Sequence, residues 1–451
     1  MATAKQKTRR KKAAMYEPEI ERMPRRDLRA LQLKRLQGTL RHAHKNVAHY
    51  RDSFEKAGVK PGDLKSLKDI SRFPFTVKAD LRDNYPFGLL AVPREKINRV
   101  HASSGTTGKP TVVGYSKRDM KNWTSLMART IVAGGGKPGD VVHNANGYGL
   151  FTGGLGFHDG ATALGCTVVP VSGGNTDRQV MLLEDFKADI LVATPSYALN
   201  IAVAAEAKGI DLKSGPLRAA LCGGEGASDA LRSEVASRLG AAMLETYGLS
   251  EVMGPGVAAE CVESNQATDE VAGLHLWEDH FYAEIIDPES GDVLPDGEVG
   301  ELVISTLTKE ALPMVRYRTG DLTRIIAAPC ICGRSHRRMA RTTGRSDDML
   351  VIRGVNLYPS ALEETLLGVA GTAPYYQLVV RPGRTMATLD VEVEADPKIK
   401  KSAYPALASK IGQRVKTAHG ISCKIIVRAP GKLPRSEGKA VRVRDLRKVK
   451  S

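Results

Sequence analysis

The sequence predicts an α/β protein of two domains: a large N-terminal domain with buried mixed sheets and a small α+β C-terminal domain. Three observations support this fold class. The 451 residues are more than one ordinary hydrophobic core organises. Apolar strands alternate with helical segments between residues 165 and 223, which is the pattern of βαβ units around a buried sheet. A further set of helices and strands is predicted after Pro359.

The predicted elements follow along the chain. Residues 15–60 carry leucines at helical spacing, which predicts a helical N-terminal region. The expected strands of the large domain are 111–115, 167–171, 190–195, 217–222 and 300–304, and its expected helices are 117–133, a segment ending near 187, a segment ending near 209, and 231–239. In the small domain we expect helices after Pro359 and over 403–418, and strands near 378–380, 388–393 and 424–427.

The composition is that of a soluble globular protein, with 42% hydrophobic and 26% charged residues. No uninterrupted apolar run is long enough to span a bilayer, and no apolar segment of a signal peptide follows the basic start. We therefore expect a cytoplasmic protein.

The net charge of +16 raises the alternative of a nucleic-acid-binding protein. Much of the excess lies at the two ends of the chain, and residues 1–14 predict a basic disordered arm. This arm has no aromatic residue before Tyr16 that would stack on bases. We disfavour this alternative and expect no nucleic-acid partner.

A polar loop at residues 102–111 suits the binding of a polyphosphate. Its glycines let the backbone approach an anion, and its hydroxyls and lysine add donors and charge; the candidate residues are Ser103, Ser104, Gly105, Thr106, Thr107, Gly108 and Lys109. The glycines are too close together for a P-loop, and Pro110 follows the lysine. An ordinary Ser/Gly surface loop is the alternative that this stretch alone leaves open.

Two further stretches carry candidate binding groups. Residues 141–156 interleave aromatic residues with glycines, which suits either a pocket wall or the close packing of a helix on a sheet. Residues 244–251 offer a tyrosine to stack on a base, a serine for a phosphate oxygen and a glutamate for magnesium, at Tyr247, Ser250 and Glu251. Asp321 ends a Tyr-Arg-Thr-Gly-Asp run and suits a ribose diol.

Together, four segments resemble the adenylate-forming superfamily of acyl-CoA synthetases, adenylation domains and luciferases. They are Ser-Ser-Gly-Thr-Thr-Gly-Lys-Pro-Thr at 103–111, Tyr-Gly-Leu-Ser-Glu at 247–251, Tyr-Arg-Thr-Gly-Asp at 317–321 and Gly-Arg-Ser-Asp-Asp at 344–348. Three others resemble the phenylacetate–CoA ligase family: Gly-Leu-Phe-Thr-Gly-Gly-Leu-Gly at 149–156, Leu-Thr-Lys-Glu-Ala-Leu-Pro at 307–313 and Arg-Gly-Val-Asn at 353–356. The resemblance extends from about residue 15 to the end of the chain.

The resemblance implies a two-step reaction. A carboxylate attacks the α-phosphate of ATP to give an acyl-adenylate and pyrophosphate, and the thiol of coenzyme A then displaces AMP. It implies ATP, Mg²⁺ and coenzyme A as cosubstrates and cofactors, an aryl or arylacetic acid as substrate, phenylacetate first among them, and a homodimer. The alternative is that the enzyme transfers the acyl group to the phosphopantetheine of a carrier protein instead of to free coenzyme A.

The resemblance also assigns residues. It implies that residues 103–109 hold the β- and γ-phosphates, that Tyr247 lies on adenine, that Ser250 contacts the α-phosphate and that Glu251 holds magnesium. The remaining expected residues are Gly224, Glu225, Gly248, Asp321 and Arg345 for ATP, and Tyr148, Phe151, Gly153 and Gly226 for the acyl pocket.

In the small domain the resemblance implies a mobile unit. Asp347 matches the family's hinge position, which gives an adenylate-forming domain at 15–346 and a C-terminal domain at 347–451. Lys439, in Pro-Arg-Ser-Glu-Gly-Lys, matches the catalytic lysine of the first step. Rotation of the domain would then remove Lys439 and bring Gly354 to the coenzyme A channel.

Two departures from the family pattern lie near the expected acyl pocket. The chain has His158-Asp159-Gly160 where these relatives read His-Tyr-Gly, and Gly-Gly-Glu-Gly at 223–226 where they carry Gly-Ala-Glu-Pro. Both departures leave open that the substrate is a substituted or a different aryl acid.

The six cysteines suggest thiols or metal ligands, because no signal peptide accompanies them. Cys330 and Cys332 are too close for a Cys-x-x-Cys site, but two thiolates still serve one zinc if other ligands join them. Our preferred set is Cys261, His275, Cys330 and Cys332, with His280 and His336 as further candidates. Free, partly buried cysteines are the alternative.

Overall fold

The computed structural model describes residues 13–103, 110–267, 273–346, 348–352, 355–382 and 387–447. Twelve residues of the predicted basic arm, 1–12, thus lie outside the described residues, as do Asp347 and Gly354. Ala13 packs against the main core, and the Ala14 carbonyl accepts a hydrogen bond from Arg334.

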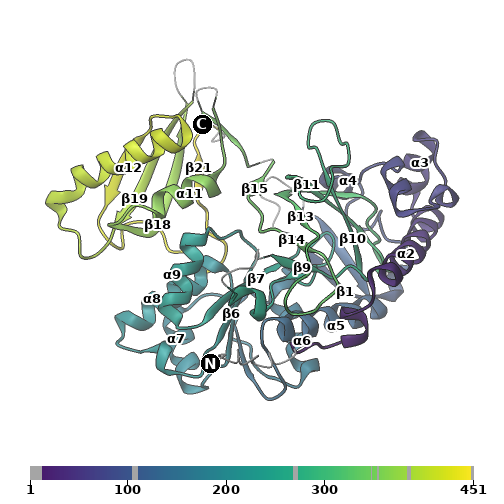
Figure 1. Ribbon diagram of the computed structural model, residues 1–451, viewed down its shortest axis with the longest axis horizontal. Helices are drawn as coiled ribbons and strands as arrows, with labels where there is room; N and C mark the ends of the chain where they lie inside the picture. The colour runs from purple at the N-terminus through teal and green to yellow at the C-terminus, as the bar shows by residue number, and fades with distance from the viewer. Residues whose placement is uncertain are drawn as a thin grey trace, which may run out of the picture.

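A nine-stranded mixed sheet forms the centre of the large domain, in the order β13-β14-β9-β8-β7-β6-β5-β3-β4 (Figure 1). Its strands are β3 (Val141–Asn144), β4 (Thr167–Val169), β5 (Ile190–Ala193), β6 (Ala219–Gly223), β7 (Ala242–Tyr247), β8 (Ala258–Ala259), β9 (Leu274–Leu276), β13 (Ile325–Ile326) and β14 (Arg338–Met339). The strands from β4 to β7 run parallel, whereas β8, β9, β14 and β13 continue the sheet in antiparallel pairs. The predicted mixed α/β sheet is confirmed.

Helices cover both faces of the parallel strands, so most residues of these strands are apolar and β5 is apolar throughout. They are α5 (Lys117–Ala133), α6 (Thr152–Leu164), α7 (Thr176–Asp185), α8 (Pro195–Ala207) and α9 (Asp229–Leu239), with the short α10 (Val262–Asn265) beside β7. In β5, Ile190 and Val192 belong to one hydrophobic core while Leu191 and Ala193 belong to a second core, shared with α7, α8 and α9. Because side chains alternate along a strand, this division places the two cores on opposite faces of the sheet.

An antiparallel sheet and a hairpin complete the large domain. The sheet joins β10 (Phe281–Ile286), β11 (Gly300–Thr306), β12 (Tyr317–Thr323) and β15 (Gly344–Arg345), and the hairpin joins β1 (Ile97–Ala102) and β2 (Val112–Ser116). The predicted helical N-terminal region consists of α1 (Pro18–Glu21), α2 (Arg25–Asn46) and α3 (Ala48–Lys56), followed by α4 (Lys78–Asp83). Short 3-10 turns occur at η1 (Pro61–Asp63), η2 (Leu67–Arg72), η3 (Arg94–Lys96), η4 (Leu212–Ser214) and η5 (Lys401–Ala403).

The small domain has its own hydrophobic core and lies beside α8 and α9 (Figure 1). Its sheet has the order β20-β19-β18-β21, and α11 contacts α9 of the large domain. The elements are β16 (Leu350–Ile352), β17 (Val355–Leu357), α11 (Pro359–Leu367), β18 (Thr372–Arg381), β19 (Thr388–Ala395), α12 (Tyr404–His419), β20 (Lys424–Arg428) and β21 (Val443–Asp445). The predicted helices and the strands at β19 and β20 agree with these bounds, whereas β18 begins earlier than the predicted strand near 378–380, and β16, β17 and β21 were not predicted.

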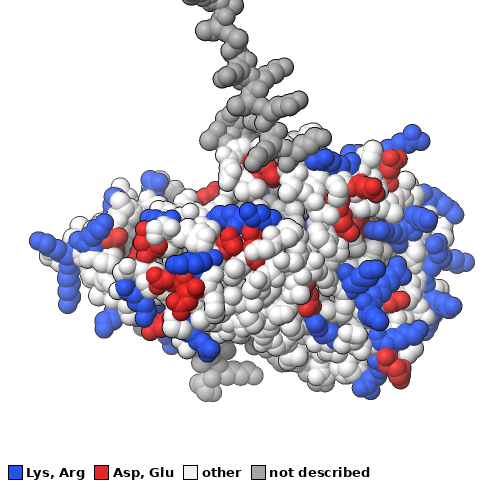
Figure 2. All heavy atoms as spheres, turned by 90° about the horizontal axis from the view of Figure 1, so that it is seen from below, with Lys and Arg blue, Asp and Glu red and all other residues white. Residues whose placement is uncertain are grey.

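Basic residues are spread over one face of the molecule (Figure 2). Figure 2 shows Lys and Arg side chains on both sides of one face of the molecule, with Asp and Glu side chains among them. Among the described residues, no helix is long and apolar enough to cross a membrane.

Candidate active site

The described ends of the predicted phosphate loop are held together by the β1–β2 hairpin. The Ser103 amide donates to the Thr111 carbonyl (3.0 Å), and the two hydroxyls are also in hydrogen-bond contact. The loop therefore leaves and re-enters the domain at one place. Its predicted phosphate-binding residues Ser104, Gly105, Thr106, Thr107, Gly108 and Lys109 lie outside the described residues.

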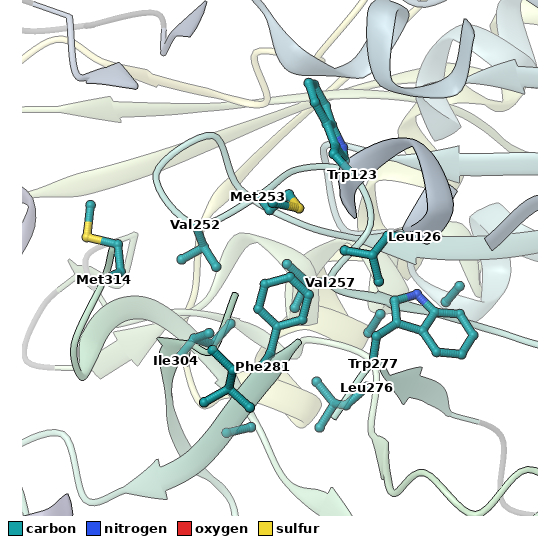
Figure 3. Packing of buried hydrophobic residues seen from close by; sticks show 14 of the residues in the cluster. Trp123, Leu126, Val252, Met253, Val257, Leu276, Trp277, Phe281, Ile304 and Met314 are labelled. Carbon is teal, nitrogen blue, oxygen red and sulfur yellow. The ribbon is translucent and has the colours of Figure 1, made fainter. Parts of the chain in front are cut away.

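Glu251 lies next to the end of this loop and is 5% exposed. Its Oε1 accepts a hydrogen bond from the Thr111 hydroxyl (3.3 Å) and lies 3.7 Å from Nζ of Lys78. The turn after Glu251 is anchored in the core, where Val252 and Met253 lie among buried apolar side chains (Figure 3). A carboxylate beside a phosphate loop, on a fixed turn, is suited to hold a cation between the protein and a polyphosphate.

Lys309 fixes the same turn. Its Nζ donates to the carbonyl of Val252 (2.8 Å) and to that of Glu251 (3.3 Å), and it lies 4.8 Å from the centre of the Tyr115 ring. Burial lowers the pKa of Lys309 to about 8, although Asp119 and Glu251 oppose this shift. The sequence contained this lysine in the Leu-Thr-Lys-Glu-Ala-Leu-Pro motif but suggested no role for it.

Tyr247 and Asp321 meet at the edge between the two large-domain sheets. The Tyr247 hydroxyl donates to Oδ2 of Asp321 (2.5 Å), and Arg345 donates to Oδ1 (2.9 Å), because β12 and β15 pair Asp321 with Arg345. Burial, then the charge of Asp321, holds the pKa of Tyr247 well above its usual range. The three residues predicted for adenosine therefore form one hydrogen-bonded group.

Gly224 and Lys439 come together although they are far apart in sequence. Gly224 has a positive φ of 85°, and a Cβ on it would lie 3.5 Å from Cε of Lys439. Lys439 therefore reaches the carboxyl end of β6, where ligands of parallel sheets bind. Gly248 also has no room for a side chain, because a Cβ there would lie 2.7 Å from Cα of Gly254.

The predicted acyl-pocket residues divide into two groups. Tyr148 and Phe151 lie on the loop before α6, and Asn144 (2.9 Å) and His158 (3.2 Å) contact the Tyr148 hydroxyl. Burial raises the pKa of Tyr148 to about 12.

The glycines of this stretch serve mainly for helix packing. Gly153 lies in the first turn of α6, and Gly156 and Gly160 face α5, where a Cβ would lie 2.7 Å from Trp123 and 2.4 Å from Met127. Close packing, one of the two interpretations left open by the sequence, thus applies to Gly156 and Gly160, with helix α5 in place of a sheet as the partner. Gly226, the last predicted pocket residue, has more space, since a Cβ on it would lie 3.7 Å from the hydroxyl oxygen of Thr342.

The four preferred metal ligands lie together. The ligand atoms of Cys261, His275, Cys330 and Cys332 are all buried and lie within 4.8 Å of one another. Sγ of Cys261 is 3.6 Å from that of Cys330, and Sγ of Cys332 is 3.3 Å from Nε2 of His275. The other two histidines have different partners: His280 contacts Asp279 and Thr308, and Nδ1 of His336 faces the backbone of residues 276 and 278.

Comparisons with known proteins identify the family of this chain. Residues 88–308 match the family model "AMP-binding enzyme", and residues 354–447 match "AMP-binding enzyme C-terminal domain". Phenylacetate-coenzyme A ligases from Aromatoleum evansii and from Thermus thermophilus are 53% and 48% identical to the chain, over 95% and 96% of it and 96% and 100% of their own lengths. That from Escherichia coli is 50% identical over 94% of the chain and 96% of its own length.

Fold, site and matches define an adenylate-forming acid–thiol ligase, which activates a carboxylic acid with ATP and transfers the acyl group to coenzyme A. Within this class, the chain belongs to the phenylacetate–CoA ligase family.

The solved structures also inform on the arrangement of the domains. 2-Hydroxyisobutyryl-CoA ligase in the postadenylation state, bound to an acyl-AMP, is 29% identical, with a TM-score of 0.88 over 95% of this chain and 92% of that one. The same ligase in the thioesterification state has a TM-score of 0.71, at 30% identity over 95% and 91% of the two chains. Because these are two states of one protein, the difference indicates that the two domains lie here as in the state in which the adenylate has formed.

Proposed function

We propose that this ligase acts on an arylacetic acid, with phenylacetate as the substrate to test first. The observation that carries the proposal is the identity of 48–53% to several phenylacetate-coenzyme A ligases over nearly the whole chain. The surroundings of Tyr148 support it, because an aromatic ring held by two hydrogen bonds offers a flat apolar surface of fixed orientation. Asp159, one of the departures noted in the sequence, forms an ion pair with Arg99 (2.7 Å), which supplies a partner for its charge.

The roles proposed for the chain's residues follow the motifs that these residues share with the family. Residues 103–109 would bind the β- and γ-phosphates, and Ser250 the α-phosphate. Tyr247, Asp321 and Arg345 would bind adenosine, with the backbone of Gly224, Glu225 and Gly248 along the nucleotide. The side chain of Glu225 is engaged elsewhere, because both of its carboxylate oxygens accept hydrogen bonds from backbone amides. Lys439 would neutralise charge at the α-phosphate and the carboxylate during adenylation, which is catalysis by positioning and electrostatics.

Magnesium fits the surroundings of Glu251. This carboxylate is nearly buried, has a hydroxyl and an ammonium group beside it, and lies next to the end of the phosphate loop. Magnesium prefers carboxylate and phosphate oxygens together with water, and it would supply charge neutralisation on the phosphates. For the second step, we also propose a hinge at Asp347 and a coenzyme A channel at Gly354.

Zinc fits the Cys261, His275, Cys330 and Cys332 cluster. Zinc–sulfur bonds of about 2.3 Å in a tetrahedron give sulfur–sulfur edges of about 3.8 Å. The Cys261–Cys330 separation of 3.6 Å is close to this edge and far longer than a disulfide bond of about 2.05 Å. Nδ1 of His275 faces the His336 carbonyl (3.3 Å), which leaves Nε2 for the metal. We propose a structural zinc at this cluster.

The substrate proposal is tested by coenzyme A-dependent AMP release with the purified full-length protein. The panel is phenylacetate, hydroxyphenylacetates, benzoate, aminobenzoates and medium-chain fatty acids, each also run with Lys439→Ala. We expect the highest kcat/KM with phenylacetate, and loss of the adenylation step in Lys439→Ala. A fatty acid or an aminobenzoate as the best substrate would overturn the arylacetate proposal. Turnover with a carrier protein but not with coenzyme A would identify the carrier protein as the acyl acceptor.

A further inference from the structure

The loop that carries Lys439 is seated on the large domain through several contacts. The Thr194 hydroxyl donates to the Gly438 carbonyl (2.9 Å), and the Asn200 amide donates to the Ser436 carbonyl (2.5 Å). Both large-domain residues belong to the start of α8: Thr194 is its N-cap, and Asn200 lies in its second turn. The carboxyl end of β5 therefore receives the backbone of the loop on either side of Glu437.

Glu225 makes the contact nearest to Lys439. Its Oε2 accepts a hydrogen bond from the backbone amide of Ala440, the residue that follows the lysine (2.8 Å). Its Oε1 accepts from the backbone amide of Ser196 (2.7 Å), in the first turn of α8. A helix N-terminus offers free amide donors and a partial positive charge, so it fixes the carboxylate in place. One carboxylate thus joins the large domain to the catalytic loop of the small domain.

We propose that Glu225 is a positioning residue for Lys439 in the first half-reaction only. With Oε1 fixed by α8, Oε2 holds the Ala440 amide and thereby sets where the backbone of Lys439 lies. The lysine side chain then extends past Gly224, with Cε 3.5 Å from where a Cβ of this residue would lie, which is van der Waals contact distance. The Glu225–Ala440 bond crosses between the domains, so it exists only while they are arranged as here. The inference rests on the proposed role of Lys439 and adds a role that the sequence did not assign, since the expected role of Glu225 was nucleotide binding.

Glu225→Gln is the sharpest variant because it keeps the size and removes one acceptor. Whichever way the amide is turned, its NH₂ group faces a backbone N–H, and two donors cannot bond to each other. Glu184→Gln, on the exposed surface of α7, removes the same charge away from the loop and serves as the matched control.

The two half-reactions are measured separately on full-length protein. Acid-dependent exchange of labelled pyrophosphate into ATP reports adenylation, and conversion of synthetic phenylacetyl-AMP with coenzyme A reports thioester formation. We expect Glu225→Gln to lower the kcat of exchange about 100-fold with little change in the KM for ATP, since a displacement of about 1 Å costs this much. Thioester formation should stay within about twofold of the wild type, which also shows that the variant is folded. Adding Glu225→Gln to Lys439→Ala should cause no further loss.

Three other outcomes would each overturn the inference. Equal losses in both half-reactions would indicate a general structural role, and a raised KM for ATP alone would indicate a contact with the nucleotide. An unchanged exchange rate would show that the Ala440 bond does not position Lys439. If the wild type itself catalyses no exchange with any acid of the panel, the proposed substrate class fails instead, and this failure is visible before any variant is compared.

Discussion

Single carboxylates in this protein are distinguished by the partners that surround them. Glu251 has a hydroxyl and an ammonium group beside the proposed phosphate loop, Asp321 has a phenol and a guanidinium, and Glu225 has two backbone amides. Their residue type is similar, but their chemistry is set by what each oxygen contacts. These partners favour a cation site at Glu251, a ribose contact at Asp321 and a link between the domains at Glu225.

Glu245 is a buried acid that lies next to a second acid, Glu260, and its titration should affect stability. Burial, then the charge of Glu260, raises its pKa from 4.5 to about 7, although Arg232 and Arg341 oppose the shift. A raised pKa in the folded state means that the contribution of this group to stability is complete below about pH 4.5 and is lost as the pH rises through about 7. We expect the free energy of unfolding to fall over this range.

Glu245→Gln isolates this contribution because glutamine has the same size and does not titrate. Urea unfolding at pH 5 and pH 8 should show a smaller loss of stability for the variant than for the wild type. An equal loss in the two proteins would show that Glu245 does not titrate in this range.

At the scale of elements, helix α6 shows how a glycine-rich sequence forms a helix through packing. Glycine has low helix propensity, and we predicted no helix over Thr152–Leu164. The helix forms against α5, where Gly156 and Gly160 allow close approach to Trp123 and Met127. The propensity of the residues was therefore overruled by a tertiary contact that the sequence does not show.

Two glycine substitutions test whether α6 depends on close packing against α5. A Cβ on Gly160 would lie 2.4 Å from Met127 Cβ and 2.8 Å from backbone, so Gly160→Ala should destabilise the protein by about 1–3 kcal/mol. Gly38 lies inside α2 with no atom within 4 Å of an added Cβ, so Gly38→Ala should stabilise it by about 0.5–1 kcal/mol. Chemical denaturation of both variants measures these differences. Equal effects of the two substitutions would contradict close packing at Gly160.

The four proposed zinc ligands come from three separate parts of the chain: the start of α10, β9 and the segment before β14. Protein purified without chelators should contain one zinc ion per chain by elemental analysis. Removal by chelation, or Cys332→Ser, should lower the melting temperature while adenylation persists at low temperature, because the cluster includes none of the nucleotide residues. Cys166→Ser, outside the cluster, should keep the metal. If the protein contains no zinc even after zinc is added back, the cysteines of the cluster are free thiols and the zinc proposal is wrong.

At the scale of the whole molecule, the small domain supplies partners to the large one. The backbone amides of Ser228 and Ala230, at the start of α9, donate to Glu363 and Glu364 of α11 (both 3.4 Å). Apolar contact continues the interface, since Ala373, Tyr375 and Leu433 of the small domain belong to the same core as α8 and α9. The docked arrangement therefore protects groups that a rotated domain would expose.

Hydrogen exchange tests whether this interface opens between the two steps. With a non-hydrolysable acyl-adenylate analogue, we expect slow exchange in peptides containing residues 228–230 and 440. Addition of coenzyme A should accelerate exchange there, because the partners of these amides move away. The Leu231 amide, which donates to Ser228 within the same helix (3.2 Å), is the internal control. Unchanged exchange at residues 228–230 would contradict rotation of the domain.

The sequence was sufficient to predict the class of fold, the order of the main elements, the motifs of the site and the four candidate zinc ligands. The fold class and the element order depend on local patterns of apolar periodicity and glycine-rich turns, whereas the site motifs and the zinc ligands were selected by residue type and by resemblance to a family. Only the tertiary structure decided that the Asp321 oxygens face Tyr247 and Arg345, that His336 lies behind His275, and that Lys309 supports the turn of Glu251. It also decided that Glu225 joins Ser196 to Ala440. These pairings bring together residues distant in sequence, so they are fixed by the packing of elements and leave no local signal in the chain.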